Sequence, residues 1–221
     1  MQARTVHLFV FDTYADWEPA YAVGVLHSPP APPLRAYQIR TVGVGVEPIR
    51  SAGGVTVLPD GAIADVSPSR SSLLILPGGA GWEKGEHAEA VAKAREFLAA
   101  GVPVAAICGA TFGLARGGLL DERRHTSNAP EYLDGSGYRG RGLYQVQRAV
   151  TDGNLITAGA AGALEFAHHI FLKLEFYAPQ VLESWYQLYR TGEARHYFEM
   201  MQAMTSATPG SPGLTAEMSQ P

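Results

Sequence analysis

The chain has 221 residues, of which 46% are hydrophobic and 17% are charged, and its formal net charge is −4. This composition is typical of one globular domain, with or without an appendage, and it excludes disordered and fibrous chains. Lys and Arg form no basic stripe, so no nucleic-acid partner is expected. The single cysteine, Cys108, excludes an internal disulfide framework and a multi-cysteine metal site.

The N-terminal sequence MQARTVHLFVFDT leads directly into a strand-like segment and lacks the regions of a signal peptide. No apolar run approaches the about 18 residues that a membrane span requires. We therefore expect a cytoplasmic protein with a reduced thiol and no membrane contact.

Apolar runs and helical spacings alternate along the chain. The first strand is expected at 6–11, followed by a helix that Thr13 or Asp16 caps. That helix is expected to carry Trp17, Ala20, Tyr21 and Leu26 on one face. The prolines of 28–34 predict a stiff loop. Further strands are expected at 37–46, 55–58, 73–76, 103–107, 125–127 and 155–157, and further helices at 88–100, 109–118 and 162–176. This order predicts a mostly parallel sheet with helices on both faces.

The segment after the expected 1–178 domain reads as a helical extension. Large apolar residues recur at helical spacing within 181–189 and 194–204. We expect 179–204 to pack as helices over the core or at a dimer interface, because an exposed apolar stripe invites aggregation. The last residues, 205–221, are rich in Ser, Thr, Pro and Gly and are expected to form a disordered tail.

The segment 102–120, VPVAAICGATFGLARGGLL, carries the sharpest chemical pattern. A buried strand leads into Cys108, and small residues follow at a helix start, as a nucleophile on a tight strand-to-helix turn requires. The helix N-terminus is then expected to lower the pKa of the thiol. The local pattern equally fits a small buried hydrophobic cysteine with no chemical role.

Two weaker patterns follow other expected strands. In Pro77-Gly78-Gly79, backbone N–H groups can approach a developing oxyanion, although an ordinary turn has the same sequence. In Asp16-Trp17-Glu18-Pro19, a carboxylate can sit beside the thiol, although acidic residues are common at helix starts.

Together, the segments FDTYADWEPA, LILPGG, AAICGATFGLARGGLL, HTSN and LITAGAAGALEFA resemble the ThiJ/PfpI family of the class I glutamine amidotransferase-like superfamily. The resemblance covers about residues 5–176. It implies a flavodoxin-like three-layer αβα sandwich, an α/β fold with Cys108 at a nucleophile elbow. It also implies that Glu18 is hydrogen-bonded to the sulfur and that Gly79 and Gly109 form an oxyanion hole. A buried Glu18 is expected to stay protonated and to donate.

The chain departs from the family pattern at the position of the base. Protease-like members place a His directly after the nucleophile, where this chain has Gly109, and other members place one where it has Asn128. The late His of glutamine amidotransferases is also missing at Ala160–Gly162. His125 is therefore a candidate substitute base, and Asn128 is a candidate auxiliary residue.

Three classes of function remain. The resemblance favours an enzyme in which Cys108 attacks a small electrophile with Glu18 as general acid/base, a hydrolase or lyase such as a glyoxalase or deglycase acting on 2-oxoaldehydes. The alternative is a redox or stress-response protein whose Cys108 is oxidised to a sulfinate. A glutamine amidotransferase or a peptidase is disfavoured because the triad His is missing. No cofactor and no metal are expected, and the expected partners are a small-molecule substrate and a second copy of the chain in a homodimer.

Overall fold

The structure, a computed structural model, describes residues 5–29 and 36–206. Most of the expected proline-rich loop at 28–34 and most of the expected tail at 205–221 lie outside the described residues. The chain divides into two compact units, with the boundary between Phe176 and Tyr177. The first unit carries the sheet, and the second carries two helices.

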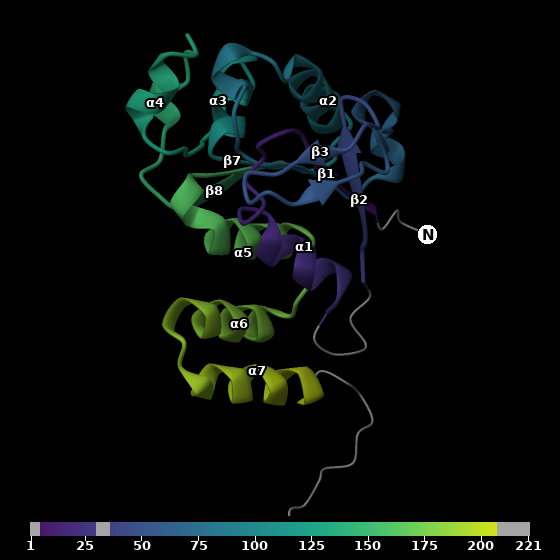
Figure 1. Ribbon diagram of the computed structural model, residues 1–221. Coiled ribbons are helices and arrows are strands. Elements are labelled where there is room, and N and C mark those ends of the chain that lie inside the picture. The colour runs from purple at the N-terminus through teal and green to yellow at the C-terminus, as the bar shows by residue number, and fades with distance from the viewer. Residues whose placement is uncertain (1–4, 30–35, 207–221) are drawn as a thin grey trace, which may run out of the picture. The chain divides into compact units, whose positions relative to one another are not determined.

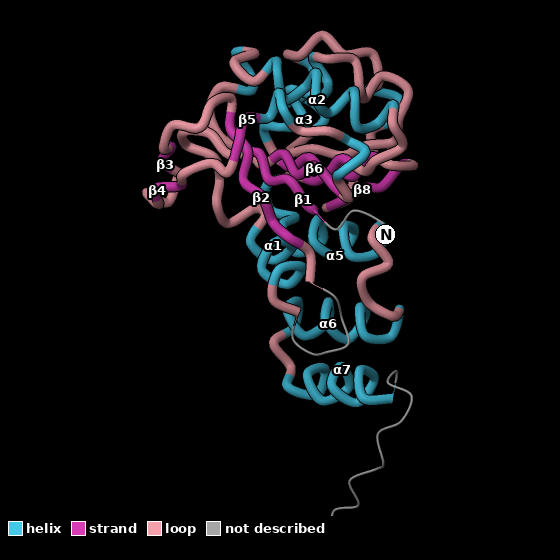
Figure 2. The backbone as a smooth tube through the Cα atoms, turned by 90° about the vertical axis from the view of Figure 1, so that its right-hand side faces the viewer, coloured by secondary structure: helices cyan, strands magenta, loops and turns pink. Residues whose placement is uncertain are grey.

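A seven-stranded sheet of order β5-β2-β1-β6-β7-β9-β8 forms the centre of the first unit (Figure 2). Its strands are β1 (Thr5–Phe9), β2 (Gln38–Gly43), β5 (Gly61–Ala62), β6 (Leu73–Leu76), β7 (Val104–Ile107), β8 (Ala149–Asp152) and β9 (Leu155–Ala158). All neighbouring pairs are parallel except β8 and β9. The predicted mostly parallel sheet is confirmed. The antiparallel edge strand β8 was not predicted, and it pairs with β9 across a short turn at 153–154.

Helices cover both faces of this sheet, which confirms the expected αβα architecture (Figure 1). One face carries α2 (Ala88–Ala99) and α3 (Gly109–Arg116), and the other carries α1 (Ala20–His27) and α5 (Ala163–Lys173). Every residue of the central strands β6 and β7 is buried. Strands covered on both faces must be apolar throughout, as the sequences LLIL and VAAI are.

Short elements connect these layers. They are a two-stranded pair of β3 (Ile49–Arg50) and β4 (Thr56–Val57), the helix α4 (Pro130–Asp134), and the 3₁₀ turns η1 (Ile63–Asp65), η2 (Pro68–Arg70), η3 (Trp82–Lys84), η4 (Arg141–Leu143) and η5 (Ala160–Gly162). The pair β3–β4 is antiparallel, so the strand expected at 55–58 is shorter than predicted and forms one half of this pair.

Two expectations for local structure are wrong. The first helix begins at Ala20 after Pro19, and neither Thr13 nor Asp16 caps it. The Asp16 carboxylate instead accepts hydrogen bonds from Ser51 Oγ at 2.5 Å and from the Gly53 N–H at 3.2 Å. Trp17 therefore precedes the helix and is exposed, so the buried face of α1 is formed by Ala22 and Leu26.

The expected strand at 125–127 is also absent, because only His125 makes a β-bridge, to Tyr144. The hydroxyl groups of Thr126 and Ser127 are hydrogen-bonded to residues elsewhere in the chain. Thr126 Oγ1 donates to the Gln147 carbonyl at 2.7 Å, and Ser127 Oγ lies 2.6 Å from Thr111 Oγ1. Side-chain hydrogen bonds therefore hold this segment where a ladder was expected.

The second unit consists of α6 (Pro179–Thr191) and α7 (Ala194–Ser206), which pack against each other. Both helices form where the apolar spacing predicted them, and Gly192, with a φ of 72°, makes the turn between them. Val181, Leu182, Trp185 and Met200 are buried. The surface that receives this pair stays a prediction. Over the residues that are described, no helix is both long and apolar enough to cross a membrane.

Candidate active site

Cys108 lies at the junction of β7 and α3 in a strained backbone conformation, with φ 55° and ψ −124°. A positive φ is uncommon for a residue with a Cβ, and such strain is concentrated at functional sites. Two hydrogen bonds hold the turn: the Cys108 N–H donates to the Ala158 carbonyl at 2.9 Å, and Thr111 Oγ1 donates to the Cys108 carbonyl at 2.6 Å. The structure therefore forms the predicted tight strand-to-helix turn at Cys108.

Glycines around the elbow leave room for close approach. A Cβ on Gly78 would lie 2.7 Å from Cys108 Cβ and 2.9 Å from Glu18 Oε2, and a Cβ on Gly109 would lie 2.9 Å from the Trp82 ring. These contacts are shorter than van der Waals packing permits. The PGG turn is thus part of the site, and the indole N–H of Trp82 anchors it by donating to the Pro77 carbonyl at 3.0 Å.

Glu18 meets Cys108 in the interior although 90 positions separate them in the sequence. Its side chain is only 1% exposed and is hydrogen-bonded to the Cys108 thiol. Glu18 Oε2 also accepts from the Gly78 N–H at 2.6 Å. Both residues follow strands whose carboxyl ends reach the same edge of the sheet, β1 and β7, and this explains how the fold brings them together.

Burial and mutual repulsion set the protonation of this pair. Burial raises the pKa of Glu18, against the Gly78 and Cys108 hydrogen bonds, which lower it. Burial and the Glu18 charge raise the pKa of Cys108 to about 11. The expected lowering of the thiol pKa is therefore wrong, because desolvation and the adjacent carboxylate outweigh the helix N-terminus. The expectation that a buried Glu18 stays protonated and donates to the sulfur stays a prediction.

Two further donors reach the sulfur. The Gly109 N–H bonds to Cys108 and lowers its pKa, as does the side-chain amide of Asn128, whose Nδ2 donates to Sγ at 3.4 Å. Asn128 Oδ1 accepts from the Ala160 N–H at 2.8 Å, so this amide is oriented by the backbone. Asn128 also lines a cavity of about 620 Å³, together with Tyr144 and the segment 159–162. Cys108 is not itself among the lining residues, so Asn128 is the residue that both contacts the sulfur and borders this cavity.

Gly79 lies beside Gly109, as the oxyanion-hole prediction requires. A Cβ on Gly109 would come within 3.2 Å of the Gly79 carbonyl oxygen. Gly79 has a φ of 146°, and a Cβ there would clash with the Phe11 ring. The neighbouring N–H groups of Gly78 and Ala80 are bonded to Glu18 and Thr13, whereas the Gly79 N–H has no protein acceptor among the residues described.

His125 is not brought into the site. Its ring is fully buried, Nδ1 lies 2.7 Å from the Arg123 carbonyl, and Nε2 lies 3.3 Å from Tyr138 Oη. Burial lowers its pKa. Both ring nitrogens are engaged away from Cys108, so the candidate base is a packed structural histidine.

Sequence reasoning missed Tyr132 and Glu83. The Tyr132 hydroxyl donates to the Glu83 carboxylate, so the short helix α4 is tied to the turn η3. Burial and Glu83 raise the pKa of Tyr132, and the charges of Cys108 and Glu18 add to this effect. No sequence signal marks these residues, since neither lies in a strand-end motif.

The fold and the site define an α/β protein with a cysteine at a strained strand-to-helix turn and a buried carboxyl partner. The chain belongs to the DJ-1/PfpI family, whose sequence model matches residues 4–173. The assignment from the sequence motifs is thereby confirmed.

Three relatives illustrate the range of the family. The chain is 38% identical over 208 residues to a Bacillus subtilis protein called "Uncharacterized protease YoaZ", covering 92% of this chain and 99% of the relative. It is 29% identical over 142 residues to the "Glutathione-independent glyoxalase DJR-1.2" of Caenorhabditis elegans, covering 62% and 74%. The crystal structure of a thiJ/pfpI family protein from Bacillus anthracis is similar with a TM-score of 0.87 and 37% identity, covering 92% of this chain and 98% of the other.

Proposed function

We propose that the protein converts a small 2-oxoaldehyde or related electrophile, with Cys108 as nucleophile and Glu18 as general acid/base. The observation that carries this proposal is the buried hydrogen bond between the Cys108 thiol and the Glu18 carboxyl group at a strained strand-to-helix turn. A base with a raised pKa in direct contact with the thiol can remove its proton as the sulfur attacks.

The reaction needs no oxidant. The thiol proton passes to Glu18 while Sγ bonds to the aldehyde carbon, and the carbonyl π electrons move to oxygen. The Gly79 N–H, which is free of a protein acceptor among the described residues, supports the proposal as donor to this oxyanion. Glu18 then protonates the oxygen, removes the proton on the same carbon and returns it to the adjacent carbon. The hydroxyl proton moves to the oxygen of that adjacent carbon, which yields the thioester of a 2-hydroxy acid. Water releases a 2-hydroxy acid and the free thiol, so the net change is addition of one water.

Peptidase activity is disfavoured even though one relative is called a protease. Hydrolysis of a peptide bond needs a general acid that protonates the amine leaving group, usually a histidine. His125 is engaged elsewhere, and the residue after the nucleophile is Gly109. Addition to an aldehyde expels no leaving group in its first step, so a carboxyl–thiol pair suffices for that step.

One observation favours a second function, the redox role. Three groups surround Sγ: the Glu18 carboxyl, the Gly109 N–H and the Asn128 amide. The two N–H donors can hold the oxygens of a sulfinate, the second stage of thiol oxidation. The high pKa of Cys108 opposes this role, because peroxide attacks the thiolate.

Turnover assays with methylglyoxal test the proposal. NMR follows the loss of the 2-oxoaldehyde and the formation of the 2-hydroxy acid by the full chain. Cys108→Ser should abolish turnover, and Glu18→Gln should lower it about 100-fold or more. Glu89→Gln, which changes an exposed carboxylate of α2, is the matched control and should leave turnover unchanged.

Equal activity of the native protein and Cys108→Ser would overturn the enzyme proposal. Peroxide treatment decides between the two functions: a redox protein gains two oxygens on Cys108 quantitatively without any turnover of methylglyoxal. Hydrolysis of a casein substrate that is lost in Cys108→Ser would instead establish a peptidase.

A further inference from the structure

A second polar cavity, of about 450 Å³, opens over strands β1, β2 and β5. None of the residues around Cys108 lines it. Its floor includes His7 from β1 and Arg40 from β2, which are register partners, so both side chains project from the same face of the sheet. Its wall is the segment 60–70, which contributes Ser67 and Arg70.

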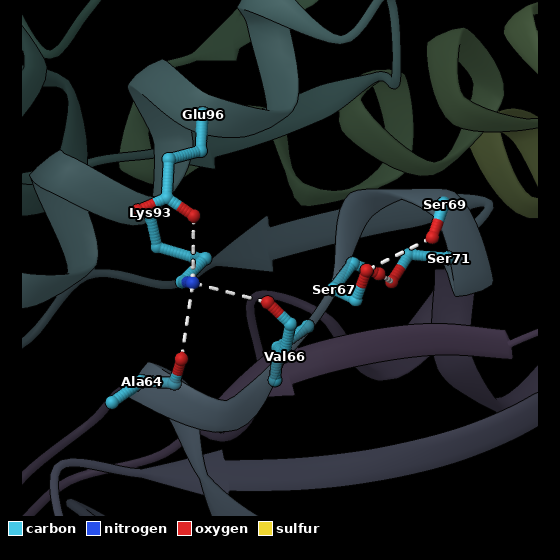
Figure 3. Close-up of polar contacts among 7 residues, drawn as sticks. All are labelled: Ala64, Val66, Ser67, Ser69, Ser71, Lys93 and Glu96. Carbon is cyan, nitrogen blue, oxygen red and sulfur yellow. Dashed lines mark hydrogen bonds and ion pairs between the residues drawn. The ribbon is translucent and has the colours of Figure 1, made fainter.

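A buried lysine holds the wall of this cavity in place. Figure 3 shows Lys93 Nζ, from α2, between the carbonyl oxygens of Ala64 at 3.2 Å and Val66 at 3.0 Å. Its third partner is Glu96 Oε2, at 2.7 Å. All three donors of the ammonium group are therefore used. Lys93 stabilises the wall of the cavity and has no donor left for a molecule inside it.

Hydrogen bonding fixes the state of His7. Ser71 Oγ donates its single hydrogen to the Ser67 carbonyl at 2.8 Å, so it must accept from His7 Nδ1, which lies 3.1 Å away. Nδ1 thus carries the ring hydrogen, and Nε2 has only a lone pair. His7 as a whole is 8% exposed, and its Nε2, which is not among the buried unpartnered atoms, has no hydrogen-bond partner among the residues described.

The cavity carries two arginines without ion pairs. Neither Arg40 nor Arg70 has a carboxylate within ion-pair distance in the described part of the chain. Both charges act on His7 and, with burial as the larger cause, lower its pKa to about 4. Two carboxylates also line the cavity: Asp60 accepts from the Thr41 N–H and hydroxyl at 2.8 and 3.0 Å, and Asp65 lies on the wall. Neither is among the charges that act on His7.

We propose that this cavity is a binding site for a small oxyanion, such as a phosphoryl or carboxylate group, in which Arg40 and Arg70 hold the anion and His7 Nε2 takes up a proton when it binds. Guanidinium groups are suited to oxyanions because their N–H donors match two oxygens at once. The bare Nε2 lone pair repels an anion, and a proton on Nε2 converts it into a third donor. Binding of the anion and of the proton must therefore favour each other.

The test uses sulfate, an oxyanion that does not titrate in the working range, and follows the full chain by calorimetry and by NMR. If the anion raises the pKa of His7 by about two units, sulfate binds about tenfold more tightly near pH 5 than near pH 7.5. Arg40→Gln and Arg70→Gln should each weaken sulfate about tenfold, whereas Arg195→Gln, the same charge change on an exposed arginine of α7, should not.

His7→Asn distinguishes proton uptake by His7 from anion binding by the two arginines. Asparagine keeps a donor for Ser71 but has no group at Nε2, so sulfate should still bind near pH 7.5 and lose the extra affinity near pH 5. Retention of that extra affinity in His7→Asn would overturn the role of His7. Binding that is undetectable, or equal in Arg40→Gln, Arg70→Gln and Arg195→Gln, would overturn the site. Titrations with inorganic phosphate and acetate then show whether tetrahedral or carboxylate anions fit better. Each outcome is independent of turnover at Cys108.

Discussion

Replacing Glu18 with Gln separates the two roles of this carboxyl, as a charge and as a base. Burial and the neighbouring charge raise the pKa of Cys108 from 9.0 to about 11. Glutamine removes the charge but keeps a carbonyl oxygen for the Gly78 N–H, so the PGG turn should be retained. Of the remaining influences, burial still raises the thiol pKa, while the Asn128 amide and the Gly109 N–H lower it.

The expected shift follows from these opposing effects. Loss of the adjacent charge should lower the pKa of Cys108 by about one to two units. Below the pKa each unit changes the thiolate fraction tenfold, so at about pH 8 the alkylation of Cys108 should be about 10- to 100-fold faster in Glu18→Gln. Turnover of a 2-oxoaldehyde should fall in the same variant, because the thiolate gains reactivity while the proton acceptor is lost.

Alkylation by iodoacetamide, followed by mass spectrometry across a pH series, measures this shift. Cys108 is the chain's single cysteine, so the signal reports one group. Glu89→Gln should behave like the native protein. Alkylation at about pH 8 that is unchanged or slower in Glu18→Gln would refute the reasoning, since it would show that Glu18 stabilises the thiolate by donating a proton to it.

Three further predictions concern stability and are checked by thermal and denaturant unfolding. Gly78→Ala should lower the free energy of unfolding by about 1–3 kcal/mol, because the new Cβ would lie 2.7 Å from Cys108 Cβ. Gly24→Ala, in open space on α1, should raise it by about 0.5–1 kcal/mol. Equal effects of the two substitutions would contradict the close approach at Gly78. Lys93→Met should lower the free energy of unfolding by about 1–3 kcal/mol, because it leaves the carbonyls of Ala64 and Val66 without donors. A decrease no larger than that of the exposed Lys84→Met would argue against a stabilising role for the buried Lys93 ammonium group. The pKa of His7 is about 4 in the folded protein and 6.5 in the unfolded chain, so the unfolded chain binds the proton first as the pH falls. The free energy of unfolding should therefore decrease by up to about 2 kcal/mol between these two pH values. His7→Asn should abolish this contribution, and an unaltered pH profile in that variant would disprove it.

The sequence by itself determined the layered fold and the tight turn that carries Cys108. Leu73–Leu76 and Val104–Ile107 are apolar at every position, which only strands covered on both faces require. The small residues around Cys108 predicted a tight turn, and the structure shows why one of them is needed: a Cβ on Gly109 would contact the Trp82 ring. The helices α6 and α7 were likewise visible as apolar spacing. In each case the signal is local, since it lies in the residues of the element itself.

Only the tertiary structure decided the chemistry of the site. The approach of Glu18 to Cys108 depends on strand order, and the pKa of the thiol depends on burial, which outweighs the local effect of the helix N-terminus. The fate of His125 was set by Tyr138 and the Arg123 carbonyl, partners that no strand alternation predicts. The pairing of His7 with Arg40 across two strands arises in the same way. Desolvation and proximity are properties of the folded chain, and residues far apart in the sequence acquire them only when the sheet brings them together.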